Sequence, residues 1–322
     1  MKRLCFLYLA VIGMLIFPVK AETIKWVDFK IPYESLKYAM EVDINTSEQE
    51  NHLSWIDVLA LAGLKTGGKC TLDSVKCAVK QMENGWTDEA LSGAQRKAYL
   101  YYEEAYSAIL GGLLGHYAIE VNGETKTYYG LKAYSPIAEG YRYCHCSDFG
   151  NSRSFGFARK HLGNDLMGNL GTPIVAVESG VVEALGWNRF GGWRVGIRSA
   201  DSKRYYYYAH LMKDKPFASD LKVGDIVQAG DLIGYMGRTG YSDHENVNNI
   251  ETVHLHFGIQ LVFEETQKEC NSEIWIDAYP IVRLLQDHRS TIVRQEGEWK
   301  RKNSFVDLDI FEYPDQRNFV EN

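Results

Sequence analysis

The sequence has 322 residues, which is enough for one large domain or two smaller ones. Hydrophobic residues make up 45% of it, an ordinary share for a globular protein with a proper core. The formal net charge is -7, which is unfavourable for sequence-independent binding of nucleic acid, because such binding depends on neutralising phosphates. The same acidic charge argues against an anionic membrane surface as the main partner.

The N-terminus has the features of an export signal. A positive start, Met1–Arg3, precedes the apolar run 4–17, and small residues follow up to Ala21. The run is short for a membrane span, which needs about 20 apolar residues. We therefore expect 1–21 to be a signal peptide, with an uncleaved membrane anchor as the alternative. The protein would then be exported, and therefore secreted, cell-wall associated or periplasmic. Loss of three cationic residues would lower the formal charge of the mature chain to -10.

From about Tyr33 to Tyr117 the pattern is helical. Apolar residues at helical spacing run from Ser54 to Ala62, and Gly63 predicts the end of that helix. Thr87 is a plausible N-cap for the long helix that follows. Because apolar and aromatic stripes of this kind are usually core, residues 22–130 are interpreted as a helical N-terminal domain without a direct catalytic role.

Five cysteines remain in the expected mature chain, and an odd number in an exported chain leaves at least one unpaired. They are Cys70, Cys77, Cys144, Cys146 and Cys270. The first two could close a small loop. Cys144-His145-Cys146 resembles a metal motif, but this is not the usual zinc spacing. An accessory bridge or free thiols are favoured over a second metal site.

Near Ser135 the helical periodicity stops, and short β-type runs separated by glycine-containing turns begin. The predicted strands are Ile174–Val177, Val181–Trp187, Trp193–Ser199, Arg204–His210, Ile226–Gln228, Leu232–Met236 and Val253–Val262. Gly191-Gly192 is a hairpin signal between two of them. Short strands at this spacing predict a compact antiparallel β domain over 131–286 and an α+β protein. Residues 287–322 are charged and aperiodic, which predicts a surface tail that wraps or frays.

Histidines recur in this β region in patterns that suit a metal site. His254 and His256 alternate with apolar residues on one predicted strand, so the two imidazoles share a face. His210 ends another strand, where alternation places it on the face of Tyr206 and Tyr208. Those two tyrosines could line a substrate site, but packing in the core is the favoured interpretation.

A carboxylate adds to these histidines as a further candidate metal ligand. His161 and Asp165 are four residues apart, and Gly163 between them permits a turn that would let both side chains converge. Zinc binds neutral imidazole nitrogen and carboxylate oxygen, and catalytic zinc sites keep three protein ligands and one open position. Each pair alone is a weak signal, but their combination in one exported β domain favours a zinc hydrolase.

A longer series of motifs connects these residues. The series is His161-x3-Asp165, Gly171-Thr-Pro-Ile-Val-Ala-Val-Glu-Ser-Gly180-Val-Val, Tyr208-Ala-His210-Leu, Val223-Gly-Asp-x-Val227-x-Ala-Gly230-Asp-x-Ile233-Gly234, Gly237-x-Thr239-Gly240-Tyr-Ser242 and His254-Leu-His256-Phe257. In order and spacing it resembles the lysostaphin-type (LytM-like) zinc endopeptidases, which cut peptidoglycan cross-links and stem peptides. The resemblance covers about Ser135 to Val262, less than half the chain.

The resemblance implies a lysostaphin-type, duplicated hybrid motif-like β domain and a role for each matching residue. His161, Asp165 and His256 match the ligands of one zinc ion, and His210 and His254 match the two catalytic histidines. We favour His254 as the general base because it lies beside a ligand on one strand face. His210 would stabilise the oxyanion or donate to the leaving amine, although the two roles could be exchanged.

One departure from the family pattern is the polar segment from Asp243 to Thr252, which precedes the strand of His254. It could shape the rim of a groove or occlude it. His244 in this segment is expected to be an exposed loop residue rather than an extra ligand. The remaining histidines have no partner pattern: His52, His116, His145 and His288.

The leading hypothesis is an exported zinc metalloendopeptidase that hydrolyses peptide bonds of bacterial cell-wall peptidoglycan. Its partners would be wall peptides and, through the helical domain, an envelope protein, with no nucleic acid. A catalytically silent peptidoglycan-binding or envelope scaffold module is the alternative from another class of function. A zinc peptidase that acts on proteins or free peptides is a third reading.

Overall fold

The computed structural model describes residues 29–121, 123–155, 157–267, 273–295 and 297–312. The expected signal peptide, 1–21, and Cys270 lie outside these described residues. Within them, no helix is both long enough and apolar enough to cross a bilayer.

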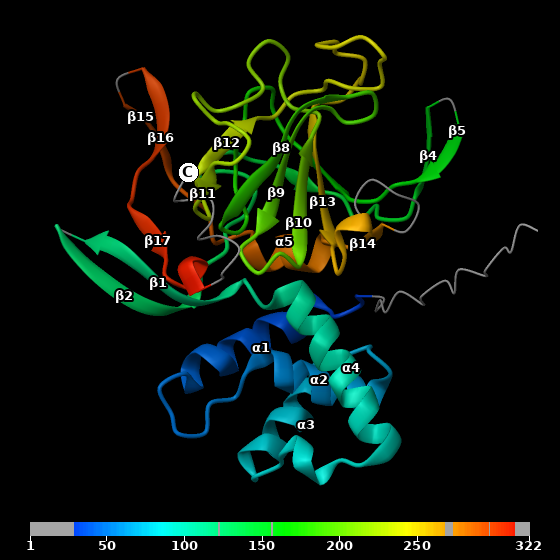
Figure 1. Cartoon of the computed structure of the whole chain (residues 1–322), viewed down its shortest axis with the longest axis vertical. Helices are drawn as coiled ribbons and strands as arrows, with labels where there is room; N and C mark the ends of the chain where they lie inside the picture. Colours follow the sequence, from blue (N-terminus) through cyan, green and yellow to red (C-terminus); the bar gives the residue numbers. More distant parts are fainter. Residues whose placement is uncertain (1–28, 122, 156, 268–272, 296, 313–322) are drawn as a thin grey trace, which may run out of the picture.

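A helical domain forms one end of the molecule, drawn in blue to teal in Figure 1. Its elements are α1 (Tyr33–Thr46), α2 (Trp55–Thr66), α3 (Leu72–Glu83), the 3-10 turn η1 (Asp88–Ala90) and α4 (Gly93–Leu110). Helix α2 is almost wholly apolar and packs against both α3 and α4. The predicted N-terminal helical region is confirmed.

Two predicted helix boundaries are wrong. Helix α2 runs through Gly63 and ends at Gly67, whose φ of 62° is left-handed. Gly63 is needed for close packing, because an added Cβ would lie 3.1 Å from the ring of Tyr102 on α4. Thr87 precedes η1 rather than the long helix, and Ser92 takes the N-cap position of α4.

The end of the predicted helical region and the predicted tail pair with each other as strands. β1 (Leu114–Val121) and β2 (Glu124–Leu131) form a hairpin, and β17 (Phe305–Asp307) adds to its β1 edge. β15 (Ile292–Gln295) and β16 (Glu298–Arg301) form another hairpin before it, and η3 (Asp309–Glu312) follows. The C-terminal region thus wraps round the molecule as ordered strands and does not fray as far as it is described.

A buried ion cluster explains why this C-terminal strand is held. The ammonium of Lys132 lies 2.8 Å from a carboxylate oxygen of Asp307 and 2.8 Å from one of Asp309. Lys132 and Asp307 are both buried. Because a buried charge is costly without a partner, this cluster fixes β17 and η3 beside the β1–β2 hairpin.

An antiparallel sheet of eight strands forms the centre of the second domain, and α5 (Tyr279–Leu285) lies across its lower end (Figure 1). Its order is β11–β8–β9–β10–β13–β6–β3, with β14 also paired to β13. The strands are β3 (Cys144–His145), β6 (Asn164–Met167), β8 (Gly180–Asn188), β9 (Gly192–Ser199), β10 (Arg204–Ala209), β11 (Ile226–Val227), β13 (His254–Leu261) and β14 (Ile274–Ile276). The α+β class and the antiparallel β domain are confirmed.

Two small ribbons flank this sheet. β7 (Pro173–Val175) pairs with β12 (Leu232–Tyr235), and β4 (Ser152–Phe155) pairs with β5 (Phe157–Lys160). The β4–β5 hairpin stands out beside the sheet (Figure 1). A further 3-10 turn, η2 (Glu265–Gln267), follows β13. The predicted hairpin at Gly191-Gly192 is confirmed as the β8–β9 connection.

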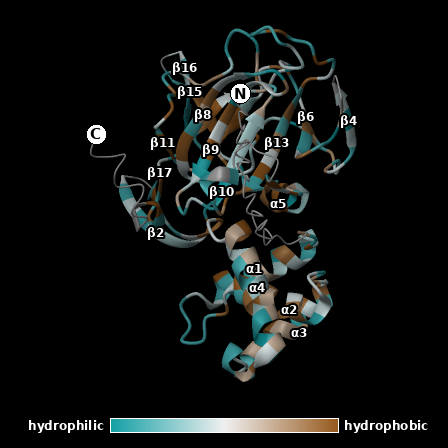
Figure 2. Ribbon diagram, turned by 45° about the vertical axis from the view of Figure 1, so that its right-hand side comes forward, coloured by the Kyte–Doolittle hydropathy of each residue, from teal (hydrophilic) through white to brown (hydrophobic). Residues whose placement is uncertain are grey.

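One face of the central sheet supplies the core. Leu255 and Phe257 of β13, with Tyr206 and Tyr208 of β10, have no more than a trace of exposed surface. Parts of the sheet strands and of α5 are brown, the hydrophobic colour, in Figure 2. This core is continuous with that of the helices. The two tyrosines therefore pack in the core, as favoured from the sequence.

A second buried ion cluster joins the two domains. Arg204, the first residue of β10, is fully buried and pairs with both carboxylate oxygens of Glu178 at 2.8 and 3.0 Å. It also pairs with Asp201 at 2.9 Å and donates to the backbone oxygen of Ala108, in the last turn of α4, at 2.7 Å. The helical domain is thus anchored at the start of β10, while His210 follows the end of that strand.

Candidate metal centre

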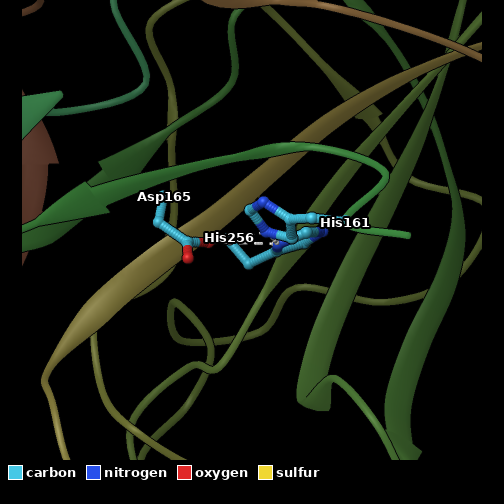
Figure 3. Close-up of side chains that lie close together, drawn as sticks. All are labelled: His161, Asp165 and His256. Carbon is cyan, nitrogen blue, oxygen red and sulfur yellow. Dashed lines mark hydrogen bonds and ion pairs between the residues drawn. The ribbon is translucent and has the colours of Figure 1, made fainter. Parts of the chain in front are cut away.

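The side chains of His161, Asp165 and His256 converge on one another (Figure 3). His161 Nε2 and His256 Nδ1 are 2.8 Å apart, and Asp165 Oδ1 lies 3.0 Å from the first and 3.2 Å from the second. Ligand bonds of about 2.0–2.1 Å in a tetrahedron place neighbouring ligand atoms about 3.3 Å apart. The triangle formed by these three atoms, here called the triangle of His161, Asp165 and His256, is therefore close to the size that one tetrahedral metal ion requires.

Strand pairing sets this convergence. Asp165 on β6 is directly opposite His256 on β13 in the antiparallel register, so their side chains share one face of the sheet. His161 lies in the connection from β5 to β6. Gly163 has no left-handed φ, but an added Cβ would lie 2.8 Å from the His256 ring. Close approach, rather than the predicted turn conformation, is thus the reason for glycine here.

A loop and a hairpin that the sequence interpretation did not use surround His161. The Asp148 carboxylate lies 3.2 Å from His161 Nδ1, and the backbone oxygen of Asp148 lies 3.1 Å from the same nitrogen. Arg153 on β4 donates to the second oxygen of Asp165 at 3.1 Å and to Asp148 at 2.7 Å. With a metal on Nε2, the neutral imidazole carries its proton on Nδ1 and donates it to Asp148.

These contacts move the proton equilibria of the cluster. Burial raises the pKa of the Asp165 carboxyl, but hydrogen bonds with His161 and His256 outweigh it and hold that pKa well below its usual range. Burial lowers the pKa of His161, but hydrogen bonds with Asp148 and Asp165 raise it to about 9. Burial lowers the pKa of His256. Asp165 is thus held as a carboxylate, the form that binds a metal.

Two further histidines flank the triangle. His210 Nδ1 lies 2.9 Å from the backbone oxygen of Thr239, and His254 Nδ1 lies 2.8 Å from that of Thr252. Since a carbonyl oxygen only accepts, each neutral ring carries its proton on Nδ1 and leaves Nε2 bare. His254 Nε2 lies 3.6 Å from Asp165 Oδ1. The ring centres of His210 and His254 are 4.8 Å apart. The site therefore presents two proton acceptors beside the ligand cluster.

His210 reaches this position because the backbone departs from the strand conformation at this residue. Alternation along β10 predicted that it would share the face of Tyr206 and Tyr208, and that prediction is wrong. Strand β10 ends at Ala209, and His210 takes a left-handed φ of 61°. Its ring therefore lies near His254, whereas Tyr206 and Tyr208 point into the core. The tyrosine of β10 that lines the site is Tyr207.

Two cavities meet at the cluster. A cavity of about 410 Å³, here called the site cavity, contains the five residues of the triangle and its flanking histidines. A cavity of about 1020 Å³, here called the sheet groove, begins at His256 and follows the polar face of the sheet. Arg159, Phe190, Tyr207 and His256 line both cavities. The sheet groove and the site cavity thus meet at the ligand cluster.

The segment from Asp243 to Thr252 forms a wall of the site cavity. Asn249, Ile250, Glu251 and Thr252 line that cavity. Asn246 holds the loop in place, because its side chain accepts from Trp193 Nε1 at 2.9 Å and donates to Asp214 at 2.6 Å. His244 is exposed and contributes nothing to the triangle, as expected. The loop shapes the rim and leaves the cavity open.

The other sequence candidates lie apart from this site. In the described part of the chain, the triangle is the sole group with metal-ligand spacing, so Cys144-His145-Cys146 forms no second one. Of the two alternatives left open for Cys70 and Cys77, free thiols rather than a bridge are found, with Cys70 buried and Cys77 exposed. His52 pairs with Asp43 at 2.9 Å, and His288 Nδ1 donates to the backbone oxygen of Ala133. Asp148 and Arg153 were missed because no spacing rule connects them to the triangle.

Comparison with known proteins agrees with this geometry. Residues 159–270 match the model of peptidase family M23. The chain contains an M23 peptidase domain. This M23 domain is homologous to the LytM- and lysostaphin-type endopeptidases, which confirms the family resemblance.

Two relatives give the extent of the likeness. The L-Ala–D-Glu endopeptidase of Bacillus subtilis is 39% identical over 152 residues, which are 47% of this chain and 42% of that protein. Lysostaphin of Staphylococcus simulans is 39% identical over 98 residues, which are 30% of this chain and 17% of that protein. The chain thus spans less than half the length of these curated relatives.

A solved structure shares the fold over most of the chain. It comes from Ruminococcus gnavus and carries the provisional name glycyl-glycine endopeptidase LytM. The TM-score is 0.55 at 23% identity, over 87% of this chain and 96% of that one. At this identity the likeness shows the fold alone, including a helical region joined to an M23 domain.

Proposed function

We propose that this protein is an exported zinc-dependent endopeptidase that hydrolyses peptide bonds of bacterial cell-wall peptidoglycan. The observation that carries the proposal is the triangle of His161, Asp165 and His256, with two proton-accepting histidines beside it and an open groove leading to it. The names of the M23 relatives, which describe endopeptidases, support the reaction class.

One zinc ion fits the donor set. His161 through Nε2, His256 through Nδ1 and Asp165 through Oδ1 would hold it, which is a three-ligand set of the kind that leaves a fourth position open. When bound, zinc would supply Lewis acidity towards a water molecule and a peptide carbonyl. Arg153 occupies the second oxygen of Asp165, so that this carboxylate would bind through one oxygen alone.

The two flanking histidines would move the protons. His254 Nε2 is directed at the ligand cluster, so we assign it the role of general base towards the attacking water. Burial, and then the neighbouring His254 and His256, hold the pKa of His210 well below its ordinary value. A protonated His210 would therefore be a strong acid, suited to donating to the oxyanion or the leaving amine. The reverse assignment uses the same atoms.

Peptidoglycan peptides are the substrate class that the site suits best. The sheet groove has a polar and aromatic floor of Arg194, Tyr205, Tyr207, Gln260 and Trp275. An extended peptide could lie along this floor with one carbonyl at the ligand cluster. The N-terminal pattern supports export, which would bring the enzyme to where wall peptides are found. An envelope protein that binds the helical domain remains a proposal for a partner.

The test uses the mature chain with zinc and purified peptidoglycan. We expect one zinc per chain and the release of new amino termini, and we expect His256→Ala to lose both. His244→Ala is the matched control, because it removes a histidine of the neighbouring loop that lies outside the triangle. Thermal unfolding of both variants shows whether either substitution disturbs the fold.

Two outcomes would contradict the proposal. Stoichiometric zinc without cleavage of any of several wall chemistries would favour the catalytically silent binding or scaffold module. Cleavage of unrelated proteins or free peptides at a rate equal to that of wall peptides would favour a general peptidase.

A further inference from the structure

Arg159 differs from the other arginines near the metal centre. It lies on β5, and its side chain lines both the site cavity and the sheet groove. Its guanidinium carbon lies 5.1 Å from the ring centre of Phe190 and 5.3 Å from that of Tyr241. Nη2 donates to the Tyr241 hydroxyl at 2.8 Å. Two rings and a hydroxyl thus hold this cation where the two cavities meet.

The charge of Arg159 has no acidic partner. Arg153 is paired with Asp148 and Asp165, and in the sheet groove Arg198 is paired with Glu183 and Glu265. Among the described residues, no carboxylate lies within ion-pairing distance of Arg159, and its Nη1 makes no hydrogen bond, while Nη2 makes the one to Tyr241. A positioned guanidinium with unused donors is the kind of group that binds a carboxylate through two parallel hydrogen bonds.

We propose that Arg159 binds a carboxylate of the substrate, and that this contact makes the enzyme selective for peptides with a free acidic group close to the scissile bond. The inference rests on the proposed function, since it takes the occupant of both cavities to be a peptide. A carboxylate is the anion that a peptide can bring to this place. Tyr241 assists by fixing the guanidinium, and its ring also contacts His210, at 5.9 Å between centres.

Binding without turnover tests this selectivity. The zinc-loaded His254→Ala protein is titrated with two synthetic stem peptides that are identical except that one has a free glutamate carboxylate where the other has the amide. Because a hydrogen bond to a charged group contributes about 1.5–3 kcal/mol, we expect the acidic peptide to bind about tenfold to a hundredfold more tightly. Arg159→Gln should abolish this ratio of affinities between the acidic and the amide peptide, and should have little effect on the affinity for the amide peptide.

Two further variants separate charge, geometry and local packing. Arg159→Lys keeps the charge but loses the planar fork, so part of the ratio should remain. Arg189→Gln is the matched control, because Arg189 also stacks on Phe190 but is paired with Asp243. It should keep the full ratio.

The inference is overturned if the two peptides bind equally, if the acidic peptide fails to bind at millimolar concentration, or if the ratio survives in Arg159→Gln. The proposed function is judged separately, by cleavage with the unsubstituted chain. A preserved binding ratio without cleavage would count against the enzyme and leave the role of Arg159 intact.

Discussion

The imidazole of His161 is held by atoms from a loop that precedes it by more than ten residues. Asp148 approaches Nδ1 with its carboxylate and also accepts the backbone N–H of Asp165 at 3.2 Å. One aspartate thereby orients two of the three ligands. Partners of this kind fix the tautomer of a ligand histidine and raise its basicity.

Asp148→Asn should therefore weaken zinc binding by about 10- to 100-fold, because the amide lacks the charge that favours a donating Nδ1–H. Competition with a chromophoric chelator measures the dissociation constant. Asp243→Asn, an exposed acid of the neighbouring loop, is the control and should leave the constant unchanged. Equal affinities for all three proteins would show that Asp148 does not support the ligands.

His145 makes the folding stability of the protein depend on pH. Burial lowers the pKa of this ring to about 4, and it stacks on Tyr279 with 4.4 Å between ring centres. The unfolded chain, with an ordinary pKa near 6.5, binds an extra proton between about pH 4 and pH 6.5. Stability from this residue is thus complete above pH 6.5 and is lost as the pH falls towards 4.

Replacing His145 by phenylalanine keeps the ring contact and removes the proton. We expect the free energy of unfolding of the native protein, relative to His145→Phe, to fall by about 1 kcal/mol or more from pH 7 to pH 5. Urea unfolding of both proteins at the two pH values measures it. A difference that does not change with pH would contradict the assignment.

At the scale of single residues, the sequence predicted that His161, Asp165 and His256 would lie together, because they belong to one ordered series of motifs. It could not predict Asp148, Arg153 or Arg159, since their roles depend on a loop and a hairpin folding back over His161. It also placed His210 on the wrong face, because a left-handed residue at the end of a strand leaves no signal in polar and apolar alternation.

At the scale of elements, strand register is what brings the candidate metal ligands Asp165 and His256 together. A slip of one residue between β6 and β13 would turn either Asp165 or His256 to the apolar face. The alternating apolar residues Leu255 and Phe257 oppose such a slip, since they are buried on the other face. The core of the sheet thereby also fixes the geometry of the ligands.

The seven strands predicted between Ile174 and Val262 agree with the structure to within a few residues, whereas β3 to β6 and β14 to β17 were not predicted and 114–131 was assigned to the helical region. Its hairpin gains a partner strand, β17, from nearly two hundred residues further along the chain. Pairing over that separation is invisible to local periodicity, and β propensity depends strongly on such context. The same long-range contact explains why the C-terminal region is ordered.

The packing of helices α2 and α3 leads to different expected reactivities for the thiols of Cys70 and Cys77. Burial raises the pKa of the Cys70 thiol to about 11, and Tyr106 lies 3.4 Å from its sulfur. Cys77 on α3 is exposed. Because the thiolate is the reactive form, iodoacetamide at pH 8 should modify Cys77 and spare Cys70 in the native protein.

Peptide mapping by mass spectrometry would measure this labelling. Unfolding in urea should make the two thiols equally reactive, which serves as the control. Equal labelling in the native state, or a disulfide between the two residues, would show that α2 and α3 pack differently.

At the scale of the whole molecule, the cluster round Arg204 joins the helical domain to the M23 domain. It lies at the start of β10, and a six-residue strand spans about 20 Å. The metal centre at the other end is thus remote from the helices, which do not cover it. Inhibition of the site by the helical domain would require a large rearrangement.

Arg204→Met should destabilise the protein by about 3–5 kcal/mol, because it leaves the Glu178 carboxylate buried without its cation. Glu178→Gln should cost about 2 kcal/mol, because Arg204 loses a charged hydrogen-bond acceptor but keeps its ion pair with Asp201. Urea unfolding followed by far-ultraviolet circular dichroism gives this value. The double variant should recover part of the loss, since it removes both charges at once. Loss of less than about 1 kcal/mol in the single variants would show that water reaches the cluster.

The anchored loop 243–252 has a consequence for how such enzymes diversify. Asn246 holds the loop in shape through Trp193 and Asp214, while Asn249 and Glu251 line the site cavity. Under the proposed function, substitutions at these two positions would alter which wall peptide is accepted and leave the reaction itself intact. Adaptation to a new target wall would then need changes in a few loop positions rather than a new catalytic apparatus.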